Sequence, residues 1–240
     1  MTLDDTFDME SKIEKEFLNR VRDWMESENA KRGKYFHVSS FVYQCARKVW
    51  YEQTIEKEAV PKIDEDGLIR TWIGTKLHET PITDYHEHPL IAKISESDFG
   101  GRLDEIYEID GKKVLIDKKF VGYIPNTMND HHYEQIMYYA ALLRETEGIV
   151  VDAVGISYFK PSVSYRSEKR YKTYVRSVSE EDLDEYIKKI HDMVGEVEKH
   201  LADNTLPDKT VSWYCKYCFF KQSCDADSKE FVSKEVEDLR

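Results

Sequence analysis

The sequence lacks a long apolar segment. Its longest run of uncharged apolar residues, IMYYAALL, covers only residues 136–143, whereas a helix that spans a membrane needs about 20 such residues. The opening residues, MTLDDTFDME, are acidic and contain no apolar core of the kind that secretory signals carry. We therefore expect a cytoplasmic protein with no membrane partner.

Internal repeats and low-complexity linkers are also absent from the 240 residues. Apolar residues make up 40% and charged residues 34%, which is typical of a soluble globular chain with a charged surface. The net charge of −12 excludes long-range attraction as the means of collecting a polyanion such as DNA. It does not exclude a local DNA site, because a site that holds divalent cations itself needs carboxylates.

The spacing of apolar residues predicts a mixed α/β fold whose sheet is at least partly antiparallel. We expect helices over 10–33, 39–53, 67–79, 127–145 and 180–202, a hairpin over 99–120, and strands over 148–159 and 169–178 that pair with each other. The segment 206–224 is expected to be irregular, and a short charged helix is expected to close the chain.

Several of these helices carry end signals. The first is expected to end at Gly33, and the second to be capped by Ser39 or Ser40. Ser179, followed three positions later by Asp182, resembles a capping box with Asp in place of the usual Glu or Gln.

The hairpin GRLDEIYEIDGKKVLIDKKF, residues 101–120, carries an aspartate in each arm. If Asp110 and Gly111 form a two-residue type I′ turn, Asp104 lies directly across the ladder from Asp117. Like charges in opposed positions destabilise a sheet, and carboxylates so close share a proton or bind a cation. The pairing therefore predicts a divalent metal site with oxygen ligands.

Lys119 follows Asp117 by two positions, so strand periodicity places it on the same face. A metal at this point could polarise a phosphate and generate hydroxide from water. The lysine could orient that water or stabilise charge that develops on the phosphate.

These residues resemble the signature of PD-(D/E)XK nucleases, with GRLDEI followed by LIDKKF and Asp117–Lys119 in the (D/E)XK position. IGTKLHE, with Gly74 and His78, resembles the Gly-xxx-His helix of the RecB-like branch, and QIMYY resembles its Gln-xxx-Tyr motif. The resemblance implies a restriction-endonuclease-like sheet flanked by helices. It also implies these roles: His78, Asp104, Asp117 and the backbone carbonyl of Lys118 as ligands of Mg²⁺ or Mn²⁺, Lys119 as a catalytic residue, and Gln135 and Tyr139 facing the nucleic acid.

The four cysteines occur as Cys45, alone, and then Cys215, Cys218 and Cys224 in CKYCFFKQSC. Two disulfides are improbable in a chain without a secretion signal, and thiols with C-x2-C spacing indicate a metal site. Zinc held by all four cysteines is the simplest interpretation.

One early cysteine with a late C-x2-C-x5-C resembles the CRISPR-associated RecB-like exonucleases. This resemblance implies that the four thiolates hold a [4Fe–4S] cluster that staples the N-terminal helical segment to the C-terminal segment. The chain departs from the family at Ala46, where a proline usually follows the first cysteine.

Aromatic residues crowd the late cysteines. The favoured interpretation is that these rings wrap the cluster and exclude water, and the alternative is a platform on which unpaired bases stack. The residues are Trp213, Tyr214, Tyr217, Phe219 and Phe220.

Together these features predict a metal-dependent DNA exonuclease that acts on single-stranded ends. The resemblance implies a setting in CRISPR adaptation or in recombination and repair, with a CRISPR integrase or recombination proteins as partners. The alternatives are a structure-specific endonuclease, a non-catalytic DNA-binding iron–sulfur partner protein, and a zinc-stapled interaction module. The expected division is an N-terminal helical segment (1–66), a nuclease core (67–178) and a C-terminal cysteine segment (179–240).

Overall fold

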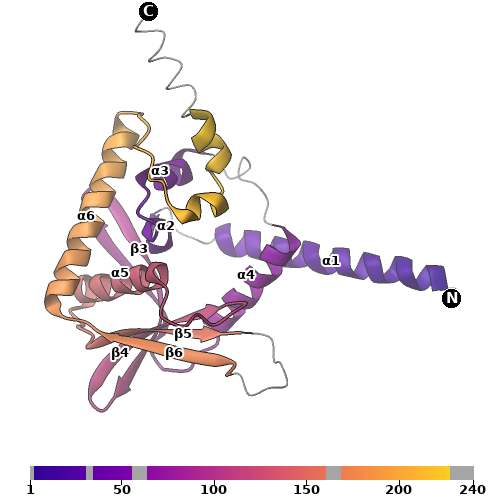
Figure 1. Cartoon of the computed structure of the whole chain (residues 1–240), viewed down its shortest axis with the longest axis horizontal. Helices are drawn as coiled ribbons and strands as arrows, with labels where there is room; N and C mark the ends of the chain where they lie inside the picture. The colour runs from indigo at the N-terminus through magenta and orange to yellow at the C-terminus, as the bar shows by residue number, and fades with distance from the viewer. Residues whose placement is uncertain (1–2, 31–34, 56–63, 161–168, 228–240) are drawn as a thin grey trace, which may run out of the picture.

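The computed structural model describes residues 3–30, 35–55, 64–160 and 169–227 (Figure 1). Its centre is a six-stranded mixed sheet in the order β1-β3-β4-β5-β6, with β2 also paired to β3. The strands are β1 (Phe36–His37), β2 (His86–Ile94), β3 (Ser97–Ile109), β4 (Lys112–Phe120), β5 (Ala153–Phe159) and β6 (Tyr171–Ser177). The helices are α1 (Leu3–Ala30), α2 (Val38–Phe41), α3 (Ala46–Thr54), α4 (Glu65–His78), α5 (Asp130–Glu147), α6 (Glu180–Ala202) and the 3₁₀ helix η2 (Trp213–Tyr217).

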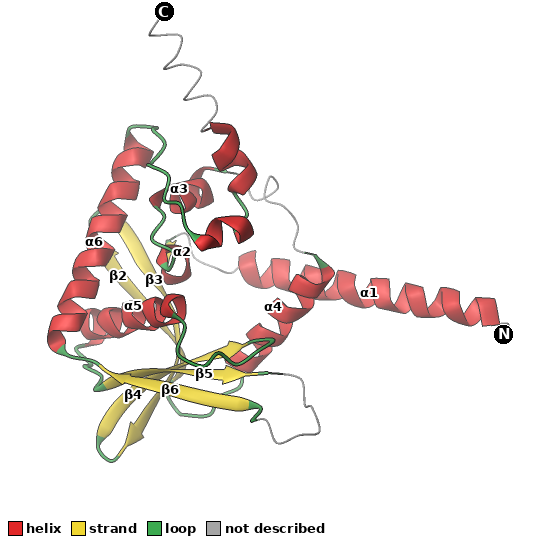
Figure 2. Cartoon of the chain, viewed as in Figure 1, coloured by secondary structure: helices red, strands yellow, loops and turns green. Residues whose placement is uncertain are grey.

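Helix α5 forms the middle of the core. It contacts β2, β3, β4 and β5 on one side and α6 on the other, as Figure 2 shows. Its residues 136–143 are all buried, which explains why the longest apolar run of the sequence is uninterrupted: a helix enclosed on several sides needs no polar stripe. No helix in the described ranges is long and apolar enough to cross a membrane.

The expected mixed α/β class is confirmed, and so is the register of the hairpin. Ile109 pairs with Lys112, and the two turn residues have positive φ angles of 52° at Asp110 and 73° at Gly111, as a type I′ turn requires. The paired ladder runs back to Glu105 and Ile116. The next positions along the two strands are Asp104 and Asp117.

Two other predictions differ from the structure: the second helix, and the segment 206–224, which was expected to be irregular but contains η2 and, from residue 221, an α-helix. The antiparallel pairing of β5 with β6 is confirmed, and α6 begins with the expected capping box at Ser179 and Asp182. The pairing of β4 with β5 is parallel, so the sheet is mixed. The expected helix end at Gly33 and most of the charged helix expected at the C-terminal end lie outside the described residues.

The prediction of one continuous helix over 39–53 is wrong. The structure contains α2 and α3, and between them Gln44 adopts a left-handed conformation with φ of 48°. Left-handed backbone ends helical hydrogen bonding, so α2 is short and Cys45 precedes α3. The predicted serine cap is also wrong, because His37 occupies the position before α2.

Candidate metal and nucleic-acid site

A cavity of about 280 Å³ lies between α1, α4, α5 and the hairpin. Elements that are distant in sequence supply its polar lining: α4 the histidine, β3 and β4 the two aspartates and the lysine, and α5 a glutamine and a tyrosine. The structure therefore brings the side chains of six predicted site residues to one place, namely His78, Asp104, Asp117, Lys119, Gln135 and Tyr139.

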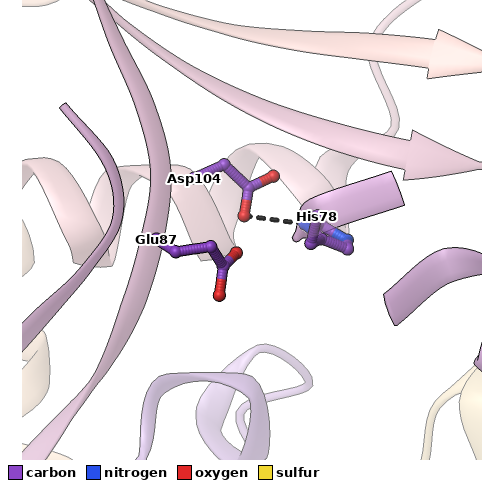
Figure 3. Close-up of side chains that lie close together, drawn as sticks. All are labelled: His78, Glu87 and Asp104. Atoms are coloured by element: carbon purple, nitrogen blue, oxygen red, sulfur yellow. Dashed lines mark ion pairs between the residues drawn. The ribbon is translucent and has the colours of Figure 1, made fainter. Parts of the chain in front are cut away.

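Asp104 is held from two sides. His78 Nδ1 lies 2.7 Å from one carboxylate oxygen (Figure 3), and the backbone N–H of Lys118 donates to the other at 2.6 Å. Only 5% of Asp104 is exposed. The carboxylate is thus fixed at the end of the hairpin ladder, with His78 placed against it by the last turn of α4.

Asp117 faces the same cavity and pairs with Lys119. The ammonium lies 3.1 Å from Oδ1 and 2.8 Å from Oδ2, but Oδ2 is buried and makes no well-directed hydrogen bond with any described residue. A buried carboxylate oxygen without such a partner carries a free-energy penalty. A cation in the cavity would remove that penalty.

The ionisation of this group follows from burial and charge. Burial raises the pKa of Asp117; the ammonium of Lys119 lowers it, the charge of Asp104 raises it, and the net direction is upward. Burial lowers the pKa of His78, but its hydrogen bond to Asp104 and the charges of both aspartates outweigh burial, so that pKa is raised. The raised pKa of His78 reflects the negative charge of the two aspartates, whereas burial is the main cause of the raised pKa of Asp117.

Lys118 points away from the cavity and braces it from behind. Its ammonium lies 3.1 Å from Glu105 and donates to the backbone carbonyls of Thr80 at 2.9 Å and His78 at 3.4 Å. Lys118 is 3% exposed and Glu105 is fully buried. The two consecutive lysines therefore have separate roles, because one lines the cavity and the other ties the end of α4 to the sheet.

The wall beside Asp104 is shaped by glycine. A Cβ on Gly101 would lie 2.8 Å from the hydroxyl and 2.9 Å from Cε1 of Tyr139, so the tyrosine can pack there only against a residue without a side chain. Burial raises the pKa of Tyr139, and the charge of Asp117 adds to that rise; a hydrogen bond from Gln135 opposes it. Gln135 and Tyr139 thus act as a connected pair at the edge of the cavity.

Glu87 is a site residue that the sequence did not reveal. One ligand atom each from His78, Glu87 and Asp104 lie within 4.8 Å of one another (Figure 3). Glu87 comes between His86, which pairs with Glu105, and His88, which pairs with Leu103, so it stands opposite Asp104. Its backbone is left-handed, with φ of 46°, which is rare for a non-glycine residue and common at functional sites.

The donor set fits a hard divalent cation. Carboxylate oxygens and an imidazole suit Mg²⁺ and Mn²⁺, and Asp117 presents a buried oxygen, Oδ2, that pairs with the ammonium of Lys119 but makes no well-directed hydrogen bond. The backbone carbonyl of Lys118, implied as a further ligand by the family resemblance, stays a prediction.

The cysteines line a second cavity of about 250 Å³. No disulfide joins these four cysteines, and each is half-buried. No three of their sulfurs, all of which lie in the described ranges, come within 4.8 Å of one another. Four basic side chains and one carboxylate share the lining: Arg47, Lys48, Lys209, Lys221 and Asp225.

The expectation that five aromatic residues wrap the cysteines is wrong for most of them. Phe220 is buried and lines the cysteine cavity. Trp213, Tyr217 and Phe219 are 59%, 60% and 45% exposed, and Tyr214 stacks on Tyr43 instead. Rings that remain in solvent cannot exclude water from a cluster.

The mixed sheet and the strand-borne carboxylates of the cavity could hold a divalent cation. The chain matches the PD-(D/E)XK nuclease superfamily over residues 15–225 and belongs to that superfamily. The crystal structure of SSO0001 has the same fold, with a TM-score of 0.58 at 19% identity over 89% of this chain and 97% of that one.

A proposed exonuclease from Eubacterium rectale is less similar. Its TM-score is 0.38 at 11% identity over 80% of this chain and 79% of that one, a likeness too weak to support an argument. A search of curated proteins finds no match to this chain.

Proposed function

We infer that the protein is a metal-dependent deoxyribonuclease that degrades single-stranded DNA from its ends. The observation that carries this inference is the meeting of two buried carboxylates, Asp104 and Asp117, with Lys119 in one cavity, where Asp117 keeps an oxygen without a well-directed hydrogen bond. Membership of a nuclease superfamily supports the same chemistry.

His78, Asp104 and Asp117 would hold Mg²⁺ or Mn²⁺, with the backbone carbonyl of Lys118 completing the set and Glu87 close enough to join it. A divalent cation in such a site polarises a phosphate oxygen and lowers the pKa of a coordinated water.

Lys119 would act on the phosphate. Its ammonium lies 2.8 Å from Asp117, and its side chain lines the cavity and is 17% exposed, so it can donate to a phosphate oxygen or to the attacking water. Such a preorganised donor stabilises the negative charge that builds up during phosphodiester hydrolysis. Gln135 and Tyr139, on the α5 side of the same cavity, would contact the nucleic acid.

The second cavity would hold a [4Fe–4S] cluster through Cys45, Cys215, Cys218 and Cys224. Tetrahedral zinc with bonds of about 2.3 Å needs sulfurs only about 3.8 Å apart, whereas no three sulfurs here approach within 4.8 Å. The basic lining suits an anionic group built on four thiolates. Iron without zinc in protein purified without oxygen, together with visible absorption, would support the cluster. Zinc without iron would contradict it.

The biological setting rests on the motifs alone. Their likeness to CRISPR-associated RecB-like exonucleases supports a role in spacer acquisition beside a CRISPR integrase, or else in recombination and repair. In that setting the segments 1–66, 67–178 and 179–240 would act as the N-terminal helical part, the nuclease core and the cysteine part of a cytoplasmic enzyme.

The test is a nuclease assay on end-labelled single-stranded DNA with Mg²⁺ or Mn²⁺. Asp117→Asn should lose on the order of 10³-fold in rate, about 4 kcal/mol of transition-state stabilisation, because the isosteric amide removes a metal ligand without removing volume. Asp98→Ala, an exposed carboxylate on β3, should leave the rate unchanged.

Equal rates for wild type and Asp117→Asn would reject the proposed site. Circular single-stranded DNA separates the modes of cleavage, since an exonuclease needs an end. Cleavage of the circle would show a structure-specific endonuclease instead.

A further inference from the structure

Three segments of the chain bring aromatic rings together at the start of α5. They are the break between α2 and α3, the first turn of α5, and η2. Tyr43 stacks on Tyr214 with ring centroids 3.5 Å apart and an angle of 8°, and His131 lies 5.9 Å from Tyr43 and 5.5 Å from Trp213. These four rings, Tyr43, His131, Trp213 and Tyr214, are called the aromatic platform below.

The platform is held in place but open to solvent. Trp213 makes edge contacts with Tyr43 at 6.0 Å, Tyr214 at 6.1 Å and Tyr217 at 6.2 Å, yet it is 59% exposed. Such contacts fix the indole without covering it, so little rotamer freedom remains to be lost when something binds. An exposed ring that is already immobilised is suited to receive another flat ring.

The platform adjoins the nuclease cavity. Burial lowers the pKa of His131, the positive charge of Lys119 lowers it further, and Asp130 opposes the shift. His131 also lies one helical turn before Gln135, which lines the nuclease cavity, so the two residues share a face of α5.

Both signs of charge lie beside the platform, since Asp130 directly precedes His131, so charge alone does not select a strand that carries phosphates. Helix η2 contains Lys216 and no carboxylate, and Lys216 Nζ lies 4.7 Å from the ring centre of Tyr217. The chain as a whole carries −12, so general electrostatic attraction cannot supply the affinity for DNA. Base stacking can supply it, because every base offers a flat face whatever its sequence.

We propose that the aromatic platform binds unpaired bases of the strand whose phosphate is cleaved beside Lys119. A duplex keeps its base faces covered by neighbouring pairs, so only a single strand can stack on Trp213. This assignment rests on the proposed nuclease function, and it gives that function its single-strand preference. An apolar protein partner for the same rings is the competing occupant that the test must separate.

The test compares Trp213→Ala and Trp213→Phe with wild type. Binding of fluorescent oligothymidylate is measured with Ca²⁺ in place of Mg²⁺ to prevent cleavage, and hydrolysis of bis(p-nitrophenyl) phosphate is measured with Mn²⁺. Loss of one stacked base corresponds to a roughly 5- to 150-fold weaker dissociation constant, so Trp213→Ala should show a loss of this order. Trp213→Phe should keep most of the affinity, and both variants should hydrolyse the small phosphodiester at the wild-type rate because it reaches only the metal cavity.

Binding to an oligonucleotide without bases tests the stacking proposal most directly. Wild type should bind an abasic oligonucleotide about as weakly as Trp213→Ala binds oligothymidylate, and Trp213→Ala should lose little more on the abasic strand. Tyr171→Ala, which removes an aromatic ring that is 62% exposed on β6, is the matched control and should bind like wild type.

The outcomes separate the two proposals. If wild type hydrolyses neither DNA nor the small phosphodiester, the nuclease function itself is rejected. If wild type hydrolyses both and Trp213→Ala binds oligothymidylate as wild type does, the platform is rejected as a base site while the nuclease stands. Equal affinity of wild type for abasic and normal strands would reject base stacking too, leaving these rings as a surface for a protein.

Discussion

The cavity at Asp104 and Asp117 and the cavity at the four cysteines have similar volumes, about 280 and 250 Å³, but different means hold them together. In the first, hydrogen bonds and ion pairs between buried side chains fix the walls before any cation arrives. In the second, one sulfur comes from the residue before α3 and three come from short helices and turns in the C-terminal segment, and no disulfide joins them.

This difference shows two ways of building a binding site. A site on neighbouring strands inherits its geometry from the ladder, so its ligand adds function to a structure that already exists. A site assembled from distant segments depends on its ligand for structure, and ligand binding then contributes to folding.

The largest effect is expected from removing the ion pair between Lys118 and Glu105, which lies behind the cavity of Asp104 and Asp117. Lys118→Met should lower the free energy of unfolding by about 3–5 kcal/mol, because it leaves the buried carboxylate of Glu105 without its partner. The double variant Lys118→Met/Glu105→Gln should recover most of this loss. Chemical denaturation measures both, and Lys112→Met, an exposed lysine on the same strand, is the control. A single variant as stable as wild type would show that the pair is no brace.

The second effect tests whether the cysteine region is a separable unit. Cys218→Ser should speed hydrogen exchange about 100-fold over 206–224 and 45–54, or about 2.7 kcal/mol of local stability, while β3, β4 and α5 keep wild-type exchange. Ser223→Ala, in the same segment, should change nothing. Mass spectrometry of exchanged peptides reports each region. Faster exchange across the whole chain would mean that the two regions are not independent.

The smallest effect is expected from a change in the wall of the cavity of Asp104 and Asp117, where Gly101 packs against Tyr139. Gly101→Ala should destabilise the protein by about 1–3 kcal/mol, because its methyl group would overlap the ring of Tyr139. In a Tyr139→Ala background the same change should cost little, since the overlapping ring is gone. Gly122→Ala, where nothing lies within 4 Å of the new Cβ, is the control. Thermal denaturation measures these losses, and equal losses in both backgrounds would show that overlap with the Tyr139 ring is not their cause.

Local signals made the hairpin and α6 predictable. A two-residue turn with Asp110 and Gly111 fixes the register of both strands, so the meeting of Asp104 and Asp117 follows from counting residues. Ser179 and Asp182 mark the start of α6 in the same local way. The convergence of His78, Gln135 and Tyr139 was expected only from family resemblance, because the placement of a helix on a sheet is not encoded in a few residues.

The features that escaped prediction depend on contacts between distant segments. β2 was not predicted, because HEHPLIAKI contains a proline and its pairing partner decides its conformation; Glu87 was therefore missed with it. The exposure of Trp213 could not be predicted either, since its neighbours come from other segments. The apolar spacing of 39–53 is helical throughout, and only packing reveals the break at Gln44.

The break between α2 and α3 at Gln44 limits which mutations the chain can tolerate. Tyr43 and Cys45 flank Gln44 directly, one in the aromatic platform and the other in the cysteine cavity. Adding or removing a single residue there would move one of the two out of place while the other stayed. Substitutions around Gln44 can therefore be tolerated, whereas insertions and deletions between Tyr43 and Cys45 cannot.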